Sequence, residues 1–420
     1  MRGATLQAIW PRISMTVRSK TIRSTVIMSI GMGLRLLSQT VSFLIVSRFM
    51  GAAEFGAFIS VAALVSIIAA FSGWGADLLI LRTVARMPSG FAQAWGSGLA
   101  FLGVSALPLA VVAMLVVPSF IKGSVPRELV YYVVIADIIF APIVSIGFGC
   151  YRAVDRPMGA ALLYVGTTTT RLVAALLWVG LGSYDARSWA RYYCGASVAF
   201  ALISLLLVCR DLGMPEWKVR SNEWRDGFQF SLLTASGIAS GAIVTPVVAL
   251  LSDLPTAGIY GATMRVVEAA VIPFYAFMFS VLPRFFRSGA SSEHDSLKLA
   301  VRMLPAALVA TLLGSLCVVV LAPIAPIFLG HSYTGTGRAM MLLAPFPVLS
   351  GLYLLAADVL VSSRHAGFRV LLQCLMPMIN IVLCILLVPY YGAIGAAIAV
   401  LISYTIMAVA AWTLAIIVSH

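Results

Sequence analysis

The sequence has little charge and no long hydrophilic stretch. Only 10% of its 420 residues are charged and 61% are hydrophobic, whereas a soluble domain carries about 25% charged residues. The mean hydropathy is +1.03. This composition excludes a soluble globular protein and indicates a membrane protein whose chain crosses the bilayer many times. Because the apolar runs leave no room for a large domain, any function must reside among the helices or in short loops.

Motifs of common enzymes and metal sites are also lacking. The sequence contains no GxxxxGK[ST] phosphate-binding loop and no HExxH zinc motif. Its six cysteines are scattered with no Cys-x-x-Cys spacing, and its four histidines fall in loops or at the C-terminus. We therefore expect cysteines that act as small buried apolar residues, no metal site, no cofactor and no enzymatic centre.

Positive charge exceeds negative charge. The chain has 28 Lys and Arg against 15 Asp and Glu, a net charge of +13. No arginine-rich tract with interleaved aromatic residues indicates binding to nucleic acid. With the N-terminus in the cytoplasm, 19 of the basic residues lie on the cytoplasmic side, 6 on the outer side and 3 within the apolar runs. By the positive-inside rule, both termini are predicted to be cytoplasmic.

Twelve apolar runs are long enough to cross a hydrocarbon core of about 30 Å as helices. The sequence therefore predicts an all-α polytopic membrane protein. Basic residues precede the first run as in a signal peptide, but the run is too long for a signal-peptide core, so we expect it to be retained. The twelve runs lie at about 25–47, 57–80, 94–118, 129–150, 158–182, 190–209, 229–252, 258–283, 300–329, 338–361, 367–388 and 392–417.

A weak internal repeat divides the chain in two. Residues 46–57 (VSRFMGAAEFGA) align without gaps with residues 251–262 (LSDLPTAGIYGA), and four of the twelve positions are identical. Each segment joins the first and second helices of a set of six, which predicts two parallel six-helix bundles. The predicted limits are 1–24 for a basic cytoplasmic N-terminal segment, 25–209 for the first bundle, 210–228 for a cytoplasmic linker and 229–420 for the second bundle.

Three arginines, Arg35, Arg171 and Arg265, lie inside predicted helices, where insertion scales put the cost of a charge at about 2.5–3.5 kcal/mol. Their helices come from both bundles, so a cleft between the bundles would bring them together. A guanidinium stays charged when buried and binds phosphate through two parallel hydrogen bonds. Together with Gln39 and Thr168, which lie near them on the same helices, these arginines are the predicted substrate-binding residues.

Buried carboxylates offer an alternative explanation. Asp137 and Glu268 lie deep enough in their helices to pair with the arginines, and such pairs would only fix helix packing. The same two carboxylates could instead bind a coupling ion. Asp77 and Asp358 lie near the predicted cytoplasmic ends of their helices, where an interfacial position is more usual. The sequence leaves these alternatives open.

Three segments together resemble the MOP exporter superfamily, in particular its polysaccharide branch, the O-antigen and exopolysaccharide repeat-unit flippases. They are VSRFMGAAEFGAFISV (46–61), TAGIYGATMRVVEAAVIPF (256–274) and PYYGAIGAAIAVLISY (389–404). The resemblance extends over essentially the whole chain and implies a MATE-like V-shaped fold. It also implies transport of an undecaprenyl-pyrophosphate-linked oligosaccharide repeat unit across the bacterial inner membrane, by alternating access through a cationic central cavity.

The same resemblance implies partners: the lipid-linked oligosaccharide, membrane lipids, and polysaccharide polymerase and export proteins, with the chain acting as a monomer. Two other functions compete. A multidrug or organic-cation antiporter of the same superfamily would use Asp137, Glu268 and Asp358 as its working residues. A membrane-embedded polysaccharide polymerase or ligase would typically carry a large periplasmic loop, which this sequence does not show. The excess of deep arginines over deep carboxylates favours the flippase.

Overall fold

The computed structural model describes residues 4–121, 125–217, 223–291, 293–362 and 366–419. Throughout these ranges the regular elements are helices, with no strand, as the apolar runs predicted. They are α1 (Ala4–Ala69), α2 (Ala76–Arg86), η1 (Pro88–Gly90), α3 (Phe91–Phe120), α4 (Arg127–Val134), η2 (Ile135–Phe140), α5 (Ala141–Ala153), α6 (Pro157–Gly180), α7 (Ala186–Leu212), α8 (Glu223–Ala242), α9 (Val244–Leu251), α10 (Leu254–Ser291), α11 (Glu293–Leu321), α12 (Ala325–Leu329), η3 (His331–Tyr333), α13 (Thr336–Leu343), α14 (Phe346–Ser362) and α15 (Ala366–Ser419).

The chain is a multi-pass membrane protein. Within the described ranges, seven helices are long and apolar enough to cross a membrane, or nine if each of two bent helix pairs counts as one span. Two of the seven, α1 and α15, are each broken by a glycine with positive φ, Gly51 (φ 77°) and Gly392 (φ 54°). Glycine adopts this conformation at little cost, so each break lets the chain turn back. α1 and α15 therefore each contain residues of two of the predicted spans, one on either side of the glycine.

Two predicted spans are interrupted rather than continuous. The run at 57–80 is divided where α1 ends, and the turn that follows includes Gly73 (φ 78°) and Gly75 (φ 63°) before α2 begins. The run at 300–329 is divided into α11 and the short α12. Pro323 lies between them and has no backbone N–H to continue a helix. Both interruptions place irregular backbone next to a cavity, which is where membrane proteins tolerate it.

Prolines also account for the bends in the two bent helix pairs. α8 and α9 meet at an angle of 49°, and α13 and α14 meet at 40°. Pro246, three residues into α9, cannot donate to the carbonyl of Ala242, the last residue of α8. Pro345 lies directly between α13 and α14. Each proline therefore fixes a kink within a membrane-length segment.

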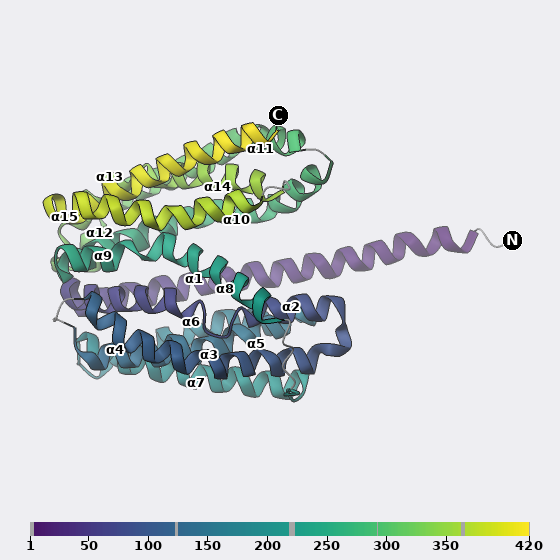
Figure 1. Ribbon diagram of the computed structural model, residues 1–420, viewed down its shortest axis with the longest axis horizontal. Helices are drawn as coiled ribbons and strands as arrows, with labels where there is room; N and C mark the ends of the chain where they lie inside the picture. Colours follow the sequence, from purple (N-terminus) through teal and green to yellow (C-terminus); the bar gives the residue numbers. More distant parts are fainter. Residues whose placement is uncertain (1–3, 122–124, 218–222, 292, 363–365, 420) are drawn as a thin grey trace.

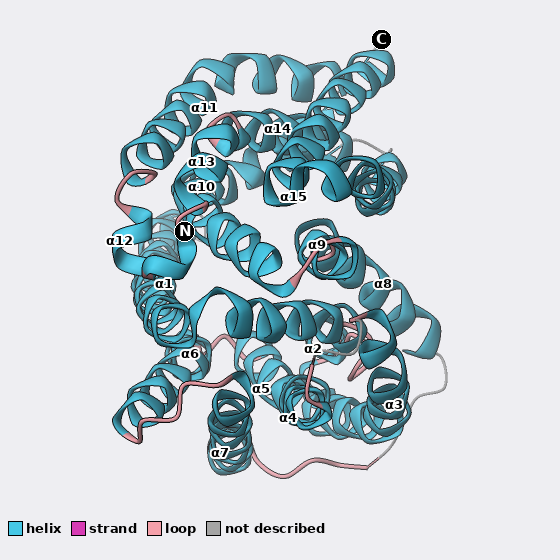
Figure 2. Cartoon of the chain, turned by 90° about the vertical axis from the view of Figure 1, so that its left-hand side faces the viewer, coloured by secondary structure: helices cyan, strands magenta, loops and turns pink. Residues whose placement is uncertain are grey.

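The helices form two groups (Figures 1 and 2). One group contains α2 to α7, the other contains α10 to α15, and α1, α8 and α9 lie between them. α1 packs against α6 of the first group and against α10 of the second. Both chain ends lie toward the same end of the molecule, where the first turns of α1 extend beyond the other helices (Figure 1). α1 therefore contacts both groups.

Candidate functional site

The two groups of helices meet at the end of the molecule where α1 turns at Gly51, which we call the Gly51 end. There the Arg48 guanidinium donates to the carbonyl oxygen of Phe328 at 3.3 Å. The Tyr333 hydroxyl donates to the carbonyl oxygen of Ser47 at 3.0 Å. These bonds join α1 to α12 and η3, so the two groups are held together at this end.

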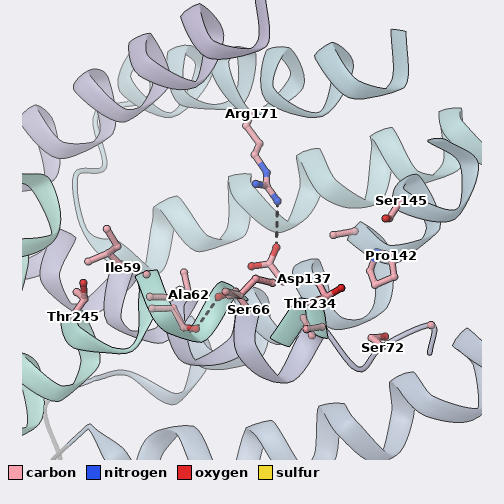
Figure 3. A pocket seen from close by; sticks show the side chains of 18 of the residues that line it. Ile59, Ala62, Ser66, Ser72, Asp137, Pro142, Ser145, Arg171, Thr234 and Thr245 are labelled. Carbon is pink, nitrogen blue, oxygen red and sulfur yellow. Dashed lines mark hydrogen bonds and ion pairs between the residues drawn. The ribbon is translucent and has the colours of Figure 1, made fainter. Parts of the chain in front are cut away.

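A cavity of about 580 Å³ lies between the two groups (Figure 3), and we call it the central cavity. Its lining begins near Ile59 in α1 and extends past the turn at residues 70–75 to Asp77, away from the Gly51 end. One wall comes from α1, α2, η2, α5, α6 and α7, and the other from α8, α9 and α10. On the topology predicted from the basic residues, the central cavity extends toward the cytoplasm.

Three side chains form a hydrogen-bonded group in one wall of the central cavity. Arg171 Nη2 donates to Asp137 Oδ1 at 3.2 Å, and the Tyr193 hydroxyl donates to the same oxygen at 2.8 Å. The guanidinium carbon of Arg171 lies 4.3 Å from the centroid of the Tyr193 ring, a cation–π contact. The exposed fractions of the Arg171 and Asp137 side chains are 27% and 14%. Arg171 is therefore paired with a carboxylate and still in contact with the cavity (Figure 3).

The backbone that carries Asp137 is shaped by a proline. Ile135–Phe140 forms a π turn, an irregularity frequent at functional sites. Pro142 has no N–H, so the carbonyl of Ile138, four residues earlier, lacks its usual helical donor. The Ser72 hydroxyl donates to that carbonyl at 2.5 Å. The turn between α1 and α2 is thereby bonded to the segment that positions Asp137.

The opposite wall carries a second arginine and a second carboxylate. Arg265 and Glu268 lie about one turn apart on α10, and both line the central cavity. Among the residues that the structure describes, neither side chain has an ion-pair or hydrogen-bond partner. Glu268 instead faces the backbone of Gly241 on α8. Both charges are thus available to a ligand or an ion in the cavity.

A second cavity, also of about 580 Å³, lies beyond these charged residues and nearer the Gly51 end. Its lining is mostly apolar, with Phe43 of α1, Val266 and Ile272 of α10, and Leu321 and Phe328 of α11 and α12. It shares part of its wall with the central cavity, whose lining is the more polar of the two, so the charged side chains stand at the boundary between a more polar and a more apolar compartment. The shared residues are Ile59, Ala62, Arg171, Tyr193, Arg265 and Glu268.

The structure brings Arg171 and Arg265 together at this boundary, and it places Gln39 in the lining of the second cavity. Thr168 is buried on α6, and its hydroxyl donates to the carbonyl of Val165, in its own helix, at 2.9 Å. Of the predicted substrate-binding residues, these two arginines and Gln39 therefore contact a cavity.

Arg35 has a different environment. Its guanidinium carbon lies 3.9 Å from the centroid of the Tyr164 ring, and Tyr164 in turn stacks on Phe148 with centroids 5.3 Å apart. Neither cavity described above includes Arg35 in its lining. A cation over an aromatic ring is a stable arrangement in an apolar environment, so the contact of Arg35 with α6 accounts for a charge at this depth without a ligand.

The other acidic residues also separate. Asp358 accepts from Arg369 Nη1 at 2.7 Å, joining α14 to α15 outside both cavities. Asp77, by contrast, lines the central cavity with Asp137 and Glu268. The lining of the central cavity thus holds three carboxylates and two arginines. The excess of deep arginines counted in the sequence is not an excess in this cavity, because Arg35 lies elsewhere.

Sequence reasoning missed Tyr193, which contacts both Asp137 and Arg171. A signal was present, because Trp189 and Tyr193 are four residues apart and so lie on one face of α7, and both line the second cavity. Ser72 was missed as well. Its role depends on a carbonyl that Pro142 leaves without its helical donor, in another part of the chain.

Comparison with known proteins places the fold. No protein-family model matches the sequence, and no curated protein sequence matches it. Solved structures do match. An inward-facing multidrug resistance MATE family transporter of the MOP superfamily is similar with a TM-score of 0.78 at 14% identity, covering 94% of this chain and 97% of that one. The outward-facing structure of such a transporter gives a TM-score of 0.65 at 16% identity, covering 95% of each chain.

A third similar structure is a MOP superfamily transporter from Pyrococcus furiosus, described as having a binding pocket of reversed polarity that suggests a different function. It has a TM-score of 0.67 at 15% identity and covers 95% of each chain. These likenesses show that this chain has the fold of MATE transporters of the MOP superfamily, as its sequence predicted.

Proposed function

We propose that this chain is a transporter that moves a pyrophosphate-linked lipid oligosaccharide across the bacterial inner membrane for surface polysaccharide synthesis. The observation that supports this most is the position of Arg171 and Arg265 between the more polar central cavity and the more apolar second cavity. A lipid-linked oligosaccharide has the same order of parts: sugars, then a pyrophosphate, then a hydrocarbon chain. Guanidinium groups at the boundary would bind the pyrophosphate bidentately.

Alternating access follows from the arrangement of the helices. The groups are joined at the Gly51 end and separated by the central cavity toward Asp77. Together with the predicted topology and the MATE fold, this corresponds to an inward-facing state with cytoplasmic termini. Rocking of one group against the other would break the bonds at the Gly51 end and open the cavity outward. Polymerase and export proteins of the same process are the proposed partners of the monomer.

One observation supports a second candidate, an organic-cation antiporter. Asp77 and Glu268 both line the central cavity, and in the described part of the chain neither forms an ion pair. Carboxylates within a membrane protein can bind a cationic substrate or a coupling ion. Asp358, which the sequence suggested for this role, is held by Arg369. For the antiporter the working carboxylates would therefore be Asp77 and Glu268.

A flipping assay distinguishes the two functions. The purified chain would be reconstituted in liposomes with a fluorescent prenyl-pyrophosphate sugar, and the label in the outer leaflet would be quenched with dithionite. The flippase proposal expects more complete quenching with the chain than with empty liposomes, and loss of this gain in Arg265→Gln. Arg302→Gln, an exposed arginine of α11 outside both cavities, is the matched control and should keep native activity.

The same liposomes test the competitor. If the native chain does not flip the lipid but exchanges a fluorescent organic cation against a proton or sodium gradient, the antiporter replaces the flippase. Loss of that exchange in Glu268→Gln, but not in Asp358→Asn, would assign the cation to the central cavity. Flipping of the lipid that Arg265→Gln leaves unchanged would contradict the role of the arginines.

A further inference from the structure

The second cavity has properties that the oligosaccharide and its pyrophosphate would not use. Most of its lining is aliphatic or aromatic, and the polar side chains of α1 in it, Gln39, Thr40 and Ser42, are few. It lies on the Gly51 side of Arg171 and Arg265, whereas the more polar central cavity extends the opposite way. A wholly water-soluble substrate would have no favourable contact with such a compartment.

The rim of this cavity includes exposed residues of α11 and α12. Cys317 of α11 and Phe328 of α12 both line it, and both are exposed, Phe328 to 54%. Neighbouring turns of α11 expose large apolar side chains, among them Leu313 and Leu316. Exposed apolar side chains on a membrane helix face lipid. The cavity rim therefore borders the hydrocarbon region of the bilayer between α1 and α11–α12.

We propose that the second cavity holds the hydrocarbon chain of the transported lipid while its pyrophosphate lies between Arg171 and Arg265. This rests on the proposed function and adds a path for the hydrocarbon chain of the lipid. The hydrocarbon chain leaves the protein between α1 and α11–α12, in the half of the bilayer nearer the Gly51 end. In the inward-facing state the sugars would then occupy the cytoplasmic cavity while the hydrocarbon chain already lies at the level of the outer leaflet.

The continuity of the two cavities and the charge at their junction indicate the occupant. The two cavities share six lining residues, so a ligand can extend from one into the other without passing through a wall. Arg265, which forms no ion pair among the described residues, lies at that junction beside Glu268 and offers a guanidinium to an anionic group there. A volume of about 580 Å³ is within the range of ordinary ligand pockets, about 300–1,000 Å³. An amphiphile with an anionic group between its polar part and its hydrocarbon chain fits this order of compartments.

Affinity alone would test this poorly. A hydrocarbon chain that moves from the bilayer into an apolar cavity exchanges one apolar environment for another and gains little free energy. The position of the bound chain is therefore what must be measured. The probe is geranylgeranyl pyrophosphate with a photoactivatable diazirine at the end of its hydrocarbon chain. It would be added to the protein in lipid nanodiscs, and the cross-linked residues would be identified by mass spectrometry.

The expected result is cross-links to the segments that line the second cavity, at residues 36–46, 317–321 and 325–329. An excess of unlabelled geranylgeranyl pyrophosphate at about ten times its Kd should reduce them about tenfold by mass action. Arg265→Gln should reduce them as well. Ala269→Phe, which fills the second cavity from α10, should remove them, and Val309→Phe on the exposed face of α11 is the matched control.

Other outcomes would overturn the inference. In one such outcome, inorganic pyrophosphate competes with the probe, but cross-links form only on lipid-facing residues such as Leu312 and Leu313. That result would support the pyrophosphate site and exclude the proposed path of the hydrocarbon chain. Equal labelling of the second cavity by diazirine-tagged geranylgeraniol, unaffected by Arg265→Gln, would show that the cavity takes any hydrocarbon independently of the anion. Failure of geranylgeranyl pyrophosphate and inorganic pyrophosphate to bind at all would remove the proposed function as well.

Discussion

Gly56 of α1 and Gly258 of α10 bring the backbones of these two helices into direct contact. A Cβ at Gly56 would overlap the carbonyl oxygen of Leu254, and a Cβ at Gly258 would overlap the carbonyl oxygen of Ala52. Small residues allow this close approach between membrane helices. The two segments that contain these glycines, 46–57 and 251–262, are the same segments that align as an internal repeat in the sequence.

The first prediction follows from this contact. Gly258→Ala should force α1 and α10 apart and shift the protein away from the state closed at the Gly51 end. The shift can be measured with a cysteine introduced at Ser332, which accepts a hydrogen bond from the Ala52 N–H. In a Cys317→Ser background, a membrane-impermeant maleimide applied from outside should label it faster in Gly258→Ala than in the parent.

The control for that prediction is Gly103→Ala on α3, because a Cβ there meets no atom within 4 Å. It should leave the labelling rate at position 332 unchanged. An unchanged rate in Gly258→Ala itself would mean that the helices adjust without separating, and that the glycine contact does not set the conformation.

Removing the carboxylate of Asp137 should destabilise the protein. Asp137→Asn leaves the Arg171 guanidinium without an ionic partner in a largely buried place. Breaking a buried ion pair costs about 3–5 kcal/mol of stability. Because Arg171 also contacts the cavity, we expect a loss of about 3 kcal/mol or less. The measurement is thermal unfolding in detergent. Tyr193→Phe removes one hydrogen bond to the Asp137 carboxylate but keeps the ring over Arg171, so it should lose less, about 1.5 kcal/mol.

The double variant provides the test of that account. Asp137→Asn combined with Arg171→Gln removes both charges, so its melting temperature should exceed that of Asp137→Asn alone. A double variant less stable than both single variants would show that the two side chains contribute independently and are not coupled as a pair.

Ser72 should matter only because of Pro142. Ser72→Ala leaves the Ile138 carbonyl without the hydroxyl that bonds to it, and an unsatisfied buried acceptor costs about 1–3 kcal/mol. In a Pro142→Ala background the chain regains an N–H at position 142 that can bond to the same carbonyl. Ser72→Ala should then cost clearly less stability. Equal losses of melting temperature in both backgrounds would contradict this dependence.

Arg35 and Arg265 should behave differently when each is replaced by glutamine. Arg35→Gln removes the cation–π contact with Tyr164 and should lower the melting temperature while leaving binding of a prenyl pyrophosphate unchanged. Arg265→Gln should weaken that binding and change stability little, since Arg265 has no ionic partner among the described residues. Binding can be followed by quenching of intrinsic tryptophan fluorescence. Equal loss of binding in both variants would place Arg35 in the ligand path.

Much of the fold was predictable because it depends on local pattern. Apolar runs of membrane length become helices wherever the bilayer offers no other hydrogen-bond partner to the backbone. Gly51 and Gly392 mark turns, since glycine alone tolerates their positive φ at low cost. The break between α1 and α2 was not predicted, because its turn is stabilised by Ser72 and Ser105 bonding to distant backbone rather than by a local signal.

The candidate site was predictable only in part. A charge in an apolar helix must find a partner or a cavity, so the sequence singled out Arg171, Arg265, Asp137 and Glu268, and all four line the central cavity. The sequence could not show, for each arginine, whether its side chain contacts another side chain or lines a cavity. Arg35 lies on an aromatic ring, and Arg171 pairs with Asp137 beside the cavity. These outcomes depend on which helices lie next to one another.

The sequence by itself determined that this is an all-helical membrane protein with charged residues buried in both halves, because hydropathy and helix length are properties of single segments. Tertiary structure alone decided which charges face a common space, that a more polar and a more apolar cavity join at Arg171 and Arg265, and that α1 and α10 meet through Gly56 and Gly258. Those features arise from contacts between separate helices, such as Arg171 of α6 with Asp137 and Gly56 of α1 with Leu254 of α10. No local pattern specifies such contacts, because they form only when α1, α6 and α10 pack together.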